Sequence, residues 1–148
     1  MKITSLSHCL EDYLEAVYII NKDKKVVRVK ELAEFLNVKT PSVVDAIAKL
    51  QEKGLMVHEK YGYLELTKKG IDKAKVINKK HEEIFKFLNL FLGMDEETSE
   101  KDACGMEHHV SSKTLGKITY LMEFIETSPE GYPQWLQRFN KFIENSNS

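Results

Sequence analysis

The sequence predicts a mainly α-helical protein with one small β-hairpin wing, in which a winged helix-turn-helix precedes a second, helical region. Three observations support this. Apolar residues recur at intervals of three and four along most of the chain, the spacing of amphipathic helices. A short turn separates two helical segments near the N-terminus, and two apolar runs around a glycine follow them. The two halves also differ in charge.

Two helices open the N-terminal region. The first is predicted over residues 8–21, where leucine, valine and tyrosine side chains share one helical face. A charged segment at residues 22–25 ends it. The short β-branched run at residues 26–29 is a candidate strand, and residues 30–36 then form a short second helix.

A third helix follows a three-residue turn at residues 37–39. Thr40 is a candidate N-cap, and Pro41 occupies the first helical position, where its missing N–H costs nothing. Gly54 is a natural C-terminal cap. Helix, short turn, helix is the order of a DNA-binding helix-turn-helix.

The next segment predicts a wing. Residues 55–60 and 63–66 are two short strands around a glycine turn, and Lys60 and Tyr61 give the hairpin a basic, aromatic tip. In a helix-turn-helix the N-terminal end of the recognition helix enters the major groove, while basic side chains contact phosphates. The candidate DNA-contacting residues are Arg28, Lys39, Thr40, Pro41, Ser42, Lys60 and Tyr61. A small α+β domain that binds no nucleic acid is the alternative.

The remaining residues predict helices joined by short breaks. Helix starts are signalled at Thr67, at Asp95 or Thr98, and at Ser111 or Ser112. A last amphipathic helix contains Trp135 and the two phenylalanines that follow it, and the tail from Asn145 is expected to be loose. The apolar stripe over residues 115–125 is either core or half of a dimer seam. We therefore expect a DNA-binding domain over residues 1–70 and a helical metal-binding and dimerisation domain over residues 71–148.

Cys104, Glu107 and His108 form the pattern with the clearest chemistry. In a helix, residues at i, i+3 and i+4 lie on one face, so a thiolate, a carboxylate and an imidazole would converge. A divalent transition metal would satisfy all three. The alternative is that Glu107 and His108 are surface residues and Cys104 is a small core residue.

Composition narrows the class of protein. The 148 residues are 42% hydrophobic and 30% charged, which is typical of a soluble globular chain. Neither a membrane span nor a secretory signal is predicted, and two cysteines suit a reducing cytosol. Residues 1–80 contain 16 Lys and Arg against 11 Asp and Glu, whereas residues 81–148 contain 6 against 12. A basic first half suits a polyanion and an acidic second half suits cations, although chance could produce the same difference.

Several motifs together resemble the diphtheria toxin repressor family. They are the segment Leu10-Glu11-Asp12-Tyr13-Leu14-Glu15, the helix-turn-helix with Thr40-Pro41-Ser42-Val43, the wing Lys60-Tyr61-Gly62, His81, and Cys104-xx-Glu107-His108-His109. The similarity covers about residues 7–126, and the most similar branch is that of the short manganese transport regulators, which lack a C-terminal SH3-like domain. The resemblance implies a cytoplasmic homodimeric repressor that binds operator DNA and controls metal-uptake genes.

The resemblance also implies a ligand set. Asp12 and Glu15 from the first helix and His81 from the long helix would join the central triplet, giving the metal-binding residues Asp12, Glu15, His81, Cys104, Glu107 and His108. Two positions depart from the family patterns, because Cys104 stands where the manganese branch has Glu and Asp12 where the iron branch has Met. The resemblance implies two metal ions, or one ion with a regulatory neighbour, and the number stays open because Glu100 stands where the iron branch has a histidine of the second site.

The hybrid site favours iron(II) over manganese(II), because a thiolate is a softer ligand than a carboxylate. Cobalt(II), nickel(II) or zinc(II) are expected to substitute. No organic cofactor, membrane partner or enzymatic activity is predicted, since the chain has no phosphate-binding loop, HExxH motif or nucleophile elbow. The alternative function is that of a winged-helix regulator that does not depend on metal.

Overall fold

The computed structural model describes residues 6–131 and 133–147, and the chain divides into two compact units. One unit ends at Asn78 and the other begins at Lys79. The sequence placed the boundary between residues 70 and 71. Helix α4 (Lys68–Lys86) contains both positions, so the two units share this helix. None of the helices in the described ranges combines the length and hydropathy of a membrane crossing.

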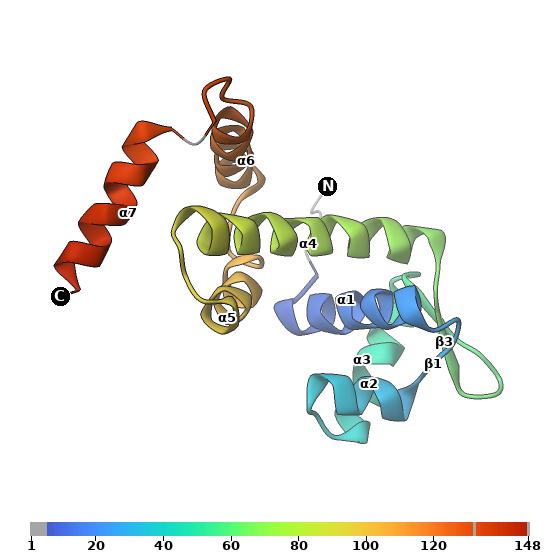
Figure 1. The fold of residues 1–148 in the computed structure, drawn as a ribbon. Helices are drawn as coiled ribbons and strands as arrows, with labels where there is room; N and C mark the ends of the chain where they lie inside the picture. The colour runs from blue at the N-terminus through green and yellow to red at the C-terminus, as the bar shows by residue number, and fades with distance from the viewer. Residues whose placement is uncertain (1–5, 132, 148) are drawn as a thin grey trace. The chain divides into compact units, whose positions relative to one another are not determined.

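The first unit is a winged helix-turn-helix, as predicted (Figure 1). Its core is formed by side chains with no or almost no exposed surface, among them Leu14, Leu32, Ile47 and Leu64. Each comes from a different helix or strand, so one apolar cluster fixes the three-helix arrangement and the wing together. The elements that precede α4 are α1 (His8–Asp23), β1 (Val27–Arg28), α2 (Val29–Leu36), α3 (Thr40–Glu52), β2 (Met56–His58) and β3 (Tyr63–Leu66).

The sheet has three antiparallel strands in the order β1-β3-β2. The hairpin of β2 and β3 was predicted, with Met56 opposite Leu66. Strand β1 adds to its other edge, where Val27 pairs with Leu64. Val29, which the sequence placed in the strand, instead begins α2. Arg28 therefore lies opposite Tyr63, the first residue of β3 after the wing turn, and directly before the helix-turn-helix.

The turn between α2 and α3 depends on Asn37, which adopts the left-handed conformation with φ 52°. Asparagine tolerates this region better than most residues. The amide N–H of Val38 donates to the carbonyl of Ala33 at 3.0 Å, which closes the end of α2. Helix α3 begins at Thr40, one residue earlier than predicted, so the N-cap is Lys39 rather than Thr40. The Lys39 side chain makes no capping hydrogen bond, and Pro41 lies in the first turn of the helix.

A junction of four residues connects the end of α3 to the start of α4. Gly54 is left-handed at φ 70°, as a C-terminal cap requires. The Thr67 hydroxyl donates to the Gly54 carbonyl at 2.7 Å and accepts from the Gly70 amide at 3.1 Å. The Thr67 amide donates to the carbonyl of Leu55 at 3.1 Å. The predicted cap at Thr67 is thus confirmed, and it also ties the recognition helix to α4.

All regular elements of the second unit are helices over its described residues, and short turns join them. Asp95 and Ser111 cap α5 and α6 as predicted, accepting from Thr98 and Thr114 at 2.8 and 3.2 Å. Helix α7 reaches Ser146, so the expectation of a loose tail from Asn145 was wrong for the residues described. After α4 the elements are a π-helical segment (Phe87–Phe91), α5 (Glu96–Met106), α6 (Ser112–Glu126) and α7 (Gln134–Ser146).

Candidate metal centre

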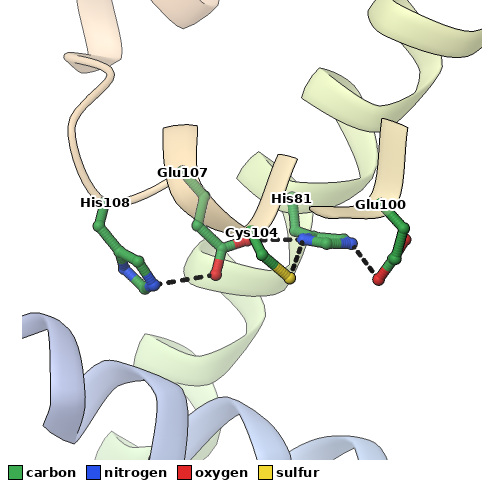
Figure 2. A network of polar contacts seen from close by, with 5 residues as sticks. All are labelled: His81, Glu100, Cys104, Glu107 and His108. Carbon is green, nitrogen blue, oxygen red and sulfur yellow. Dashed lines mark hydrogen bonds and ion pairs between the residues drawn. The ribbon is translucent and has the colours of Figure 1, made fainter. Parts of the chain in front are cut away.

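The polar cluster of the second unit is built by α4 and α5. An apolar cluster around Ile84, Leu88 and Ala103 packs α4 and the π-helical segment against α5, which brings His81 of α4 next to the α5 side chains (Figure 2). On α5, Glu100 and Cys104 are four residues apart, and Glu107 follows three residues later. This spacing places the three side chains along one helical face.

His81 is held from both sides of its ring (Figure 2). Its Nδ1 lies 2.7 Å from Oε2 of Glu107 and 3.8 Å from Sγ of Cys104. Its Nε2 lies 2.9 Å from Oε1 of Glu100. Three groups that are negative when ionised therefore surround one imidazole.

Glu107 is the most buried member of the cluster, with 1% of its side chain exposed. Its Oε1 lies 3.2 Å from Nε2 of His108, while Oε2 contacts His81. One carboxylate thus joins two imidazoles. Burying a carboxylate is costly unless it is paired, and these two contacts supply the pairing.

The electrostatic result is a strongly raised pKa for His81, from the ordinary 6.5 to about 11. The hydrogen bond to Cys104 is the largest cause, followed by the bond to Glu107, and burial opposes both. The pocket therefore favours a positive charge at the point where these groups meet. A metal ion would supply such a charge, and its binding would displace one of the two protons of the imidazolium ring.

The donor set fits a divalent transition metal. Ligand atoms of His81, Glu100 and Cys104 all lie within 4.8 Å of one another. Imidazole and thiolate suit iron, cobalt, nickel and zinc, and carboxylates also accommodate manganese. The cluster therefore offers a nitrogen donor from His81, a sulfur donor from Cys104 and an oxygen donor from Glu100.

Four of the six predicted metal ligands come together here, namely His81, Cys104, Glu107 and His108. The predicted helical triplet was wrong in one respect, because α5 ends at Met106 and Glu107 is its C-cap. His108 therefore lies in the following turn and reaches the second oxygen of Glu107 from there.

The other two predicted ligands belong to α1 of the first unit. Asp12 is exposed and Glu15 is buried, and both engage in polar interactions. Their participation in metal binding stays a prediction.

Sequence reasoning did not include Glu100 in the site. A signal was present, because Glu100, Cys104 and Glu107 stand at i, i+4 and i+7 on a helix. The residue becomes a member of the cluster through its contact with Nε2 of His81.

The predicted DNA-contacting residues lie at the surface of the first unit. Lys39 and the first turn of α3, residues 40–42, are exposed, and so is the wing tip, where Tyr61 is 84% exposed. Arg28 stacks on the ring of Tyr63 at 5.2 Å and donates to its hydroxyl at 3.2 Å. This contact holds the guanidinium beside the start of β3, next to the wing turn.

Comparison with known proteins covers both units. Residues 5–64 match the family model described as the iron dependent repressor N-terminal DNA binding domain. Residues 67–136 match the iron dependent repressor metal binding and dimerisation domain.

Individual relatives agree with the family models. An uncharacterized HTH-type transcriptional regulator of Methanocaldococcus jannaschii is 40% identical over 119 residues, which are 80% of this chain and 95% of that protein. The HTH-type transcriptional regulator MntR of Bacillus subtilis is 36% identical over 117 residues, which are 79% of this chain and 82% of that protein.

Solved structures show the same similarity. The crystal structure of T. acidophilum IdeR superposes with a TM-score of 0.71 at 25% identity, over 88% of this chain and 60% of that one. A manganese-dependent transcriptional repressor in complex with manganese gives 0.72 at 28% identity, over 81% and 55%. The chain thus spans somewhat more than half the length of these solved chains.

Proposed function

Because the chain belongs to the iron-dependent repressor family, the family of the diphtheria toxin repressor and MntR, we propose that it is a homodimeric repressor of metal-uptake genes. It binds operator DNA when a divalent transition metal occupies the centre around His81. The observation that carries this proposal is the convergence of an imidazole, a cysteine sulfur and a carboxyl group at that centre, in a chain with an exposed helix-turn-helix.

The DNA-binding role is supported by the surface of the first unit. The exposed first turn of α3 presents Thr40 and Ser42 hydroxyls with the ammonium of Lys39, which suit phosphate contacts, and the Pro41 ring suits a thymine methyl. Lys60 and Tyr61 at the wing tip, and Arg28 opposite Tyr63, would contact the backbone beside the groove.

The proposed ligands are His81, Cys104, Glu107 and His108, together with Asp12 and Glu15 of α1. Without metal, the protonated His81 ring supplies the positive charge that pairs with Glu100 and Glu107. A bound cation would supply that positive charge instead. Glu107 orients both histidines through its two oxygens. Donors from α1 would make the conformation of the DNA-binding unit depend on the occupancy of the centre.

Homodimer formation is supported by the exposed face of α6. Tyr120 and Phe124 on this helix are 68% and 67% exposed, which is unusual for aromatic side chains unless a partner covers them. Two copies would place two recognition helices in successive major grooves of a palindromic operator.

Iron(II) is the proposed metal ahead of manganese(II). The thiolate of Cys104 beside the His81 imidazole supports iron. The MntR relatives and the solved repressor with bound manganese support manganese. The two metals therefore have to be compared directly on this chain.

The central prediction is that DNA affinity depends on metal. Duplexes selected from a random pool by the metal-loaded protein should bind more weakly after chelation, by about 5- to 150-fold, the usual range of such coupling. Anaerobic gel shifts with iron(II), manganese(II) or chelator measure this. Equal binding under all three conditions would identify a metal-independent winged-helix regulator instead.

A second prediction concerns metal choice. Cys104→Glu replaces the thiolate with a hard carboxylate, so manganese(II) affinity relative to iron(II) should rise, by roughly tenfold. Competitive metal titration under anaerobic conditions measures the ratio. Cys9→Ser is the matched control, because Cys9 is the other exposed cysteine and should leave the ratio unchanged. An unchanged ratio in Cys104→Glu would show that the thiolate does not select the metal.

A further inference from the structure

Glu100 stands apart from the other acidic member of the cluster. Its side chain is 58% exposed, whereas that of Glu107 is 1% exposed. It contacts Nε2 of His81, while Glu107 and Cys104 both lie at Nδ1 (Figure 2). The two ring nitrogens therefore face different groups.

A histidine that binds a metal through one nitrogen commonly donates the N–H of the other nitrogen to a carboxylate. That second bond fixes which nitrogen carries the proton, sets the rotation of the ring and makes the metal-binding nitrogen more basic. In this centre, Nδ1 faces the sulfur and the buried carboxylate, so it is the nitrogen that points toward the other donors. Nε2 has the Glu100 carboxylate at 2.9 Å.

We propose that Glu100 is a positioning residue of the metal centre, which accepts the Nε2–H of His81 and thereby presents Nδ1 to the metal beside Cys104 and Glu107. This inference rests on the proposed metal-binding function. It assigns a role to a residue that acts through His81 rather than by binding the ion itself.

A direct ligand role for Glu100 is the competing explanation, because one of its oxygens, one nitrogen of His81 and Sγ of Cys104 lie within 4.8 Å of one another. The contact to Nε2 favours positioning. The Glu100 oxygen that accepts the Nε2–H of His81 at 2.9 Å is already engaged in that hydrogen bond. The Glu100 carboxylate is also exposed, at the edge of the cluster. The two roles respond differently to glutamine, whose amide oxygen still accepts a hydrogen bond but is a poor substitute for an anionic ligand.

The experiment uses the full chain with cobalt(II) chloride as the probe, under anaerobic conditions. Glu100→Ala should weaken cobalt affinity about 10- to 100-fold, the usual effect of losing an outer-shell partner. Glu100→Gln should recover most of that affinity and retain the wild-type cobalt absorption spectrum. Glu97→Ala, an exposed glutamate on the same helix, is the matched control and should behave as wild type.

Nitrogen-15 NMR of the zinc(II)-loaded protein gives a second readout. Wild type and Glu100→Gln should show His81 protonated at Nε2 with Nδ1 bound to zinc. Glu100→Ala should show broadened or shifted ring signals, because the hydrogen bond at Nε2 is then lost and the ring is held only through Nδ1. A merely structural role would change thermal stability without changing these ring signals.

Three outcomes would contradict the inference in different ways. Equal losses in Glu100→Gln and Glu100→Ala, with an altered cobalt spectrum, would make Glu100 a ligand. Wild-type affinity and ring signals in Glu100→Ala would leave Glu100 without a role, although the proposed function would stand. Failure of the wild-type protein to bind cobalt, iron or manganese would overturn the proposed function itself.

Discussion

Glu107→Ala is expected to weaken metal binding by more than about 100-fold and to remove the response of DNA binding to metal. Losing one outer-shell partner of a metal ligand typically costs about 10- to 100-fold, and Glu107 is itself a proposed ligand as well as the partner of two histidines. Its oxygens lie 2.7 Å from His81 and 3.2 Å from His108. The alanine variant removes all of these roles at once.

The same change should destabilise the metal-free protein. With a pKa of about 11, the His81 ring is positively charged at neutral pH, and the buried carboxylate is one of the groups that compensate this charge. Removing one partner of a buried pair typically costs about 3–5 kcal/mol, because the other charge is left without compensation. Cys104 and Glu100 stay near the ring, so we expect the lower end of that range.

Two measurements separate these effects. Anaerobic calorimetric titration with iron(II) or manganese(II) gives metal affinity, and urea unfolding in chelator gives the stability of the metal-free protein. Glu107→Gln is the matched variant, because it keeps the volume and one acceptor oxygen but loses the charge. It should remain folded and still bind metal poorly. Metal affinity close to that of wild type in both variants would remove Glu107 from the ligand set.

Local sequence signals predicted much of the fold. Helix starts at Thr67, Asp95 and Ser111 follow from side chains that cap the first amides, which is a property of three or four consecutive residues. The partner and the two-residue extent of β1, which was predicted as a strand over residues 26–29, and the π-helical segment at residues 87–91 could not be derived in this way. The first depends on pairing with a distant strand, and the second on how the end of α4 packs against α5.

The candidate site was predictable only in part for the same reason. Cys104 and Glu107 are close in sequence, so a helical pattern places them together. The approach of His81 depends on the packing of α4 on α5, and it was expected only from the resemblance to a known family. His108 shows the limit of the helical assumption, because the helix ends before it and a turn brings it to Glu107 instead.

A second large effect on folding is expected at Gly70. Glycine near the start of a helix is normally a weak point, and alanine there usually stabilises a helix by about 1 kcal/mol. Here an added Cβ would overlap the carbonyl oxygen of Leu55 and lie 2.9 Å from its carbonyl carbon. Both atoms are backbone, and the same carbonyl accepts the amide of Thr67, so neither side can move without breaking the junction.

Gly70→Ala should therefore lower the free energy of unfolding of the first unit by about 3 kcal/mol, at the upper end of the usual cost of overpacking. DNA binding should weaken with it, since the junction ties the end of α3 to α4. Gly105→Ala on α5 is the matched control, because an added Cβ meets open space there and should raise the free energy of unfolding by about 0.5–1 kcal/mol. Urea unfolding of the two variants measures both values. If Gly70→Ala were as stable as wild type, the close approach of Leu55 to α4 would be wrong, and with it the account of how the recognition helix is held.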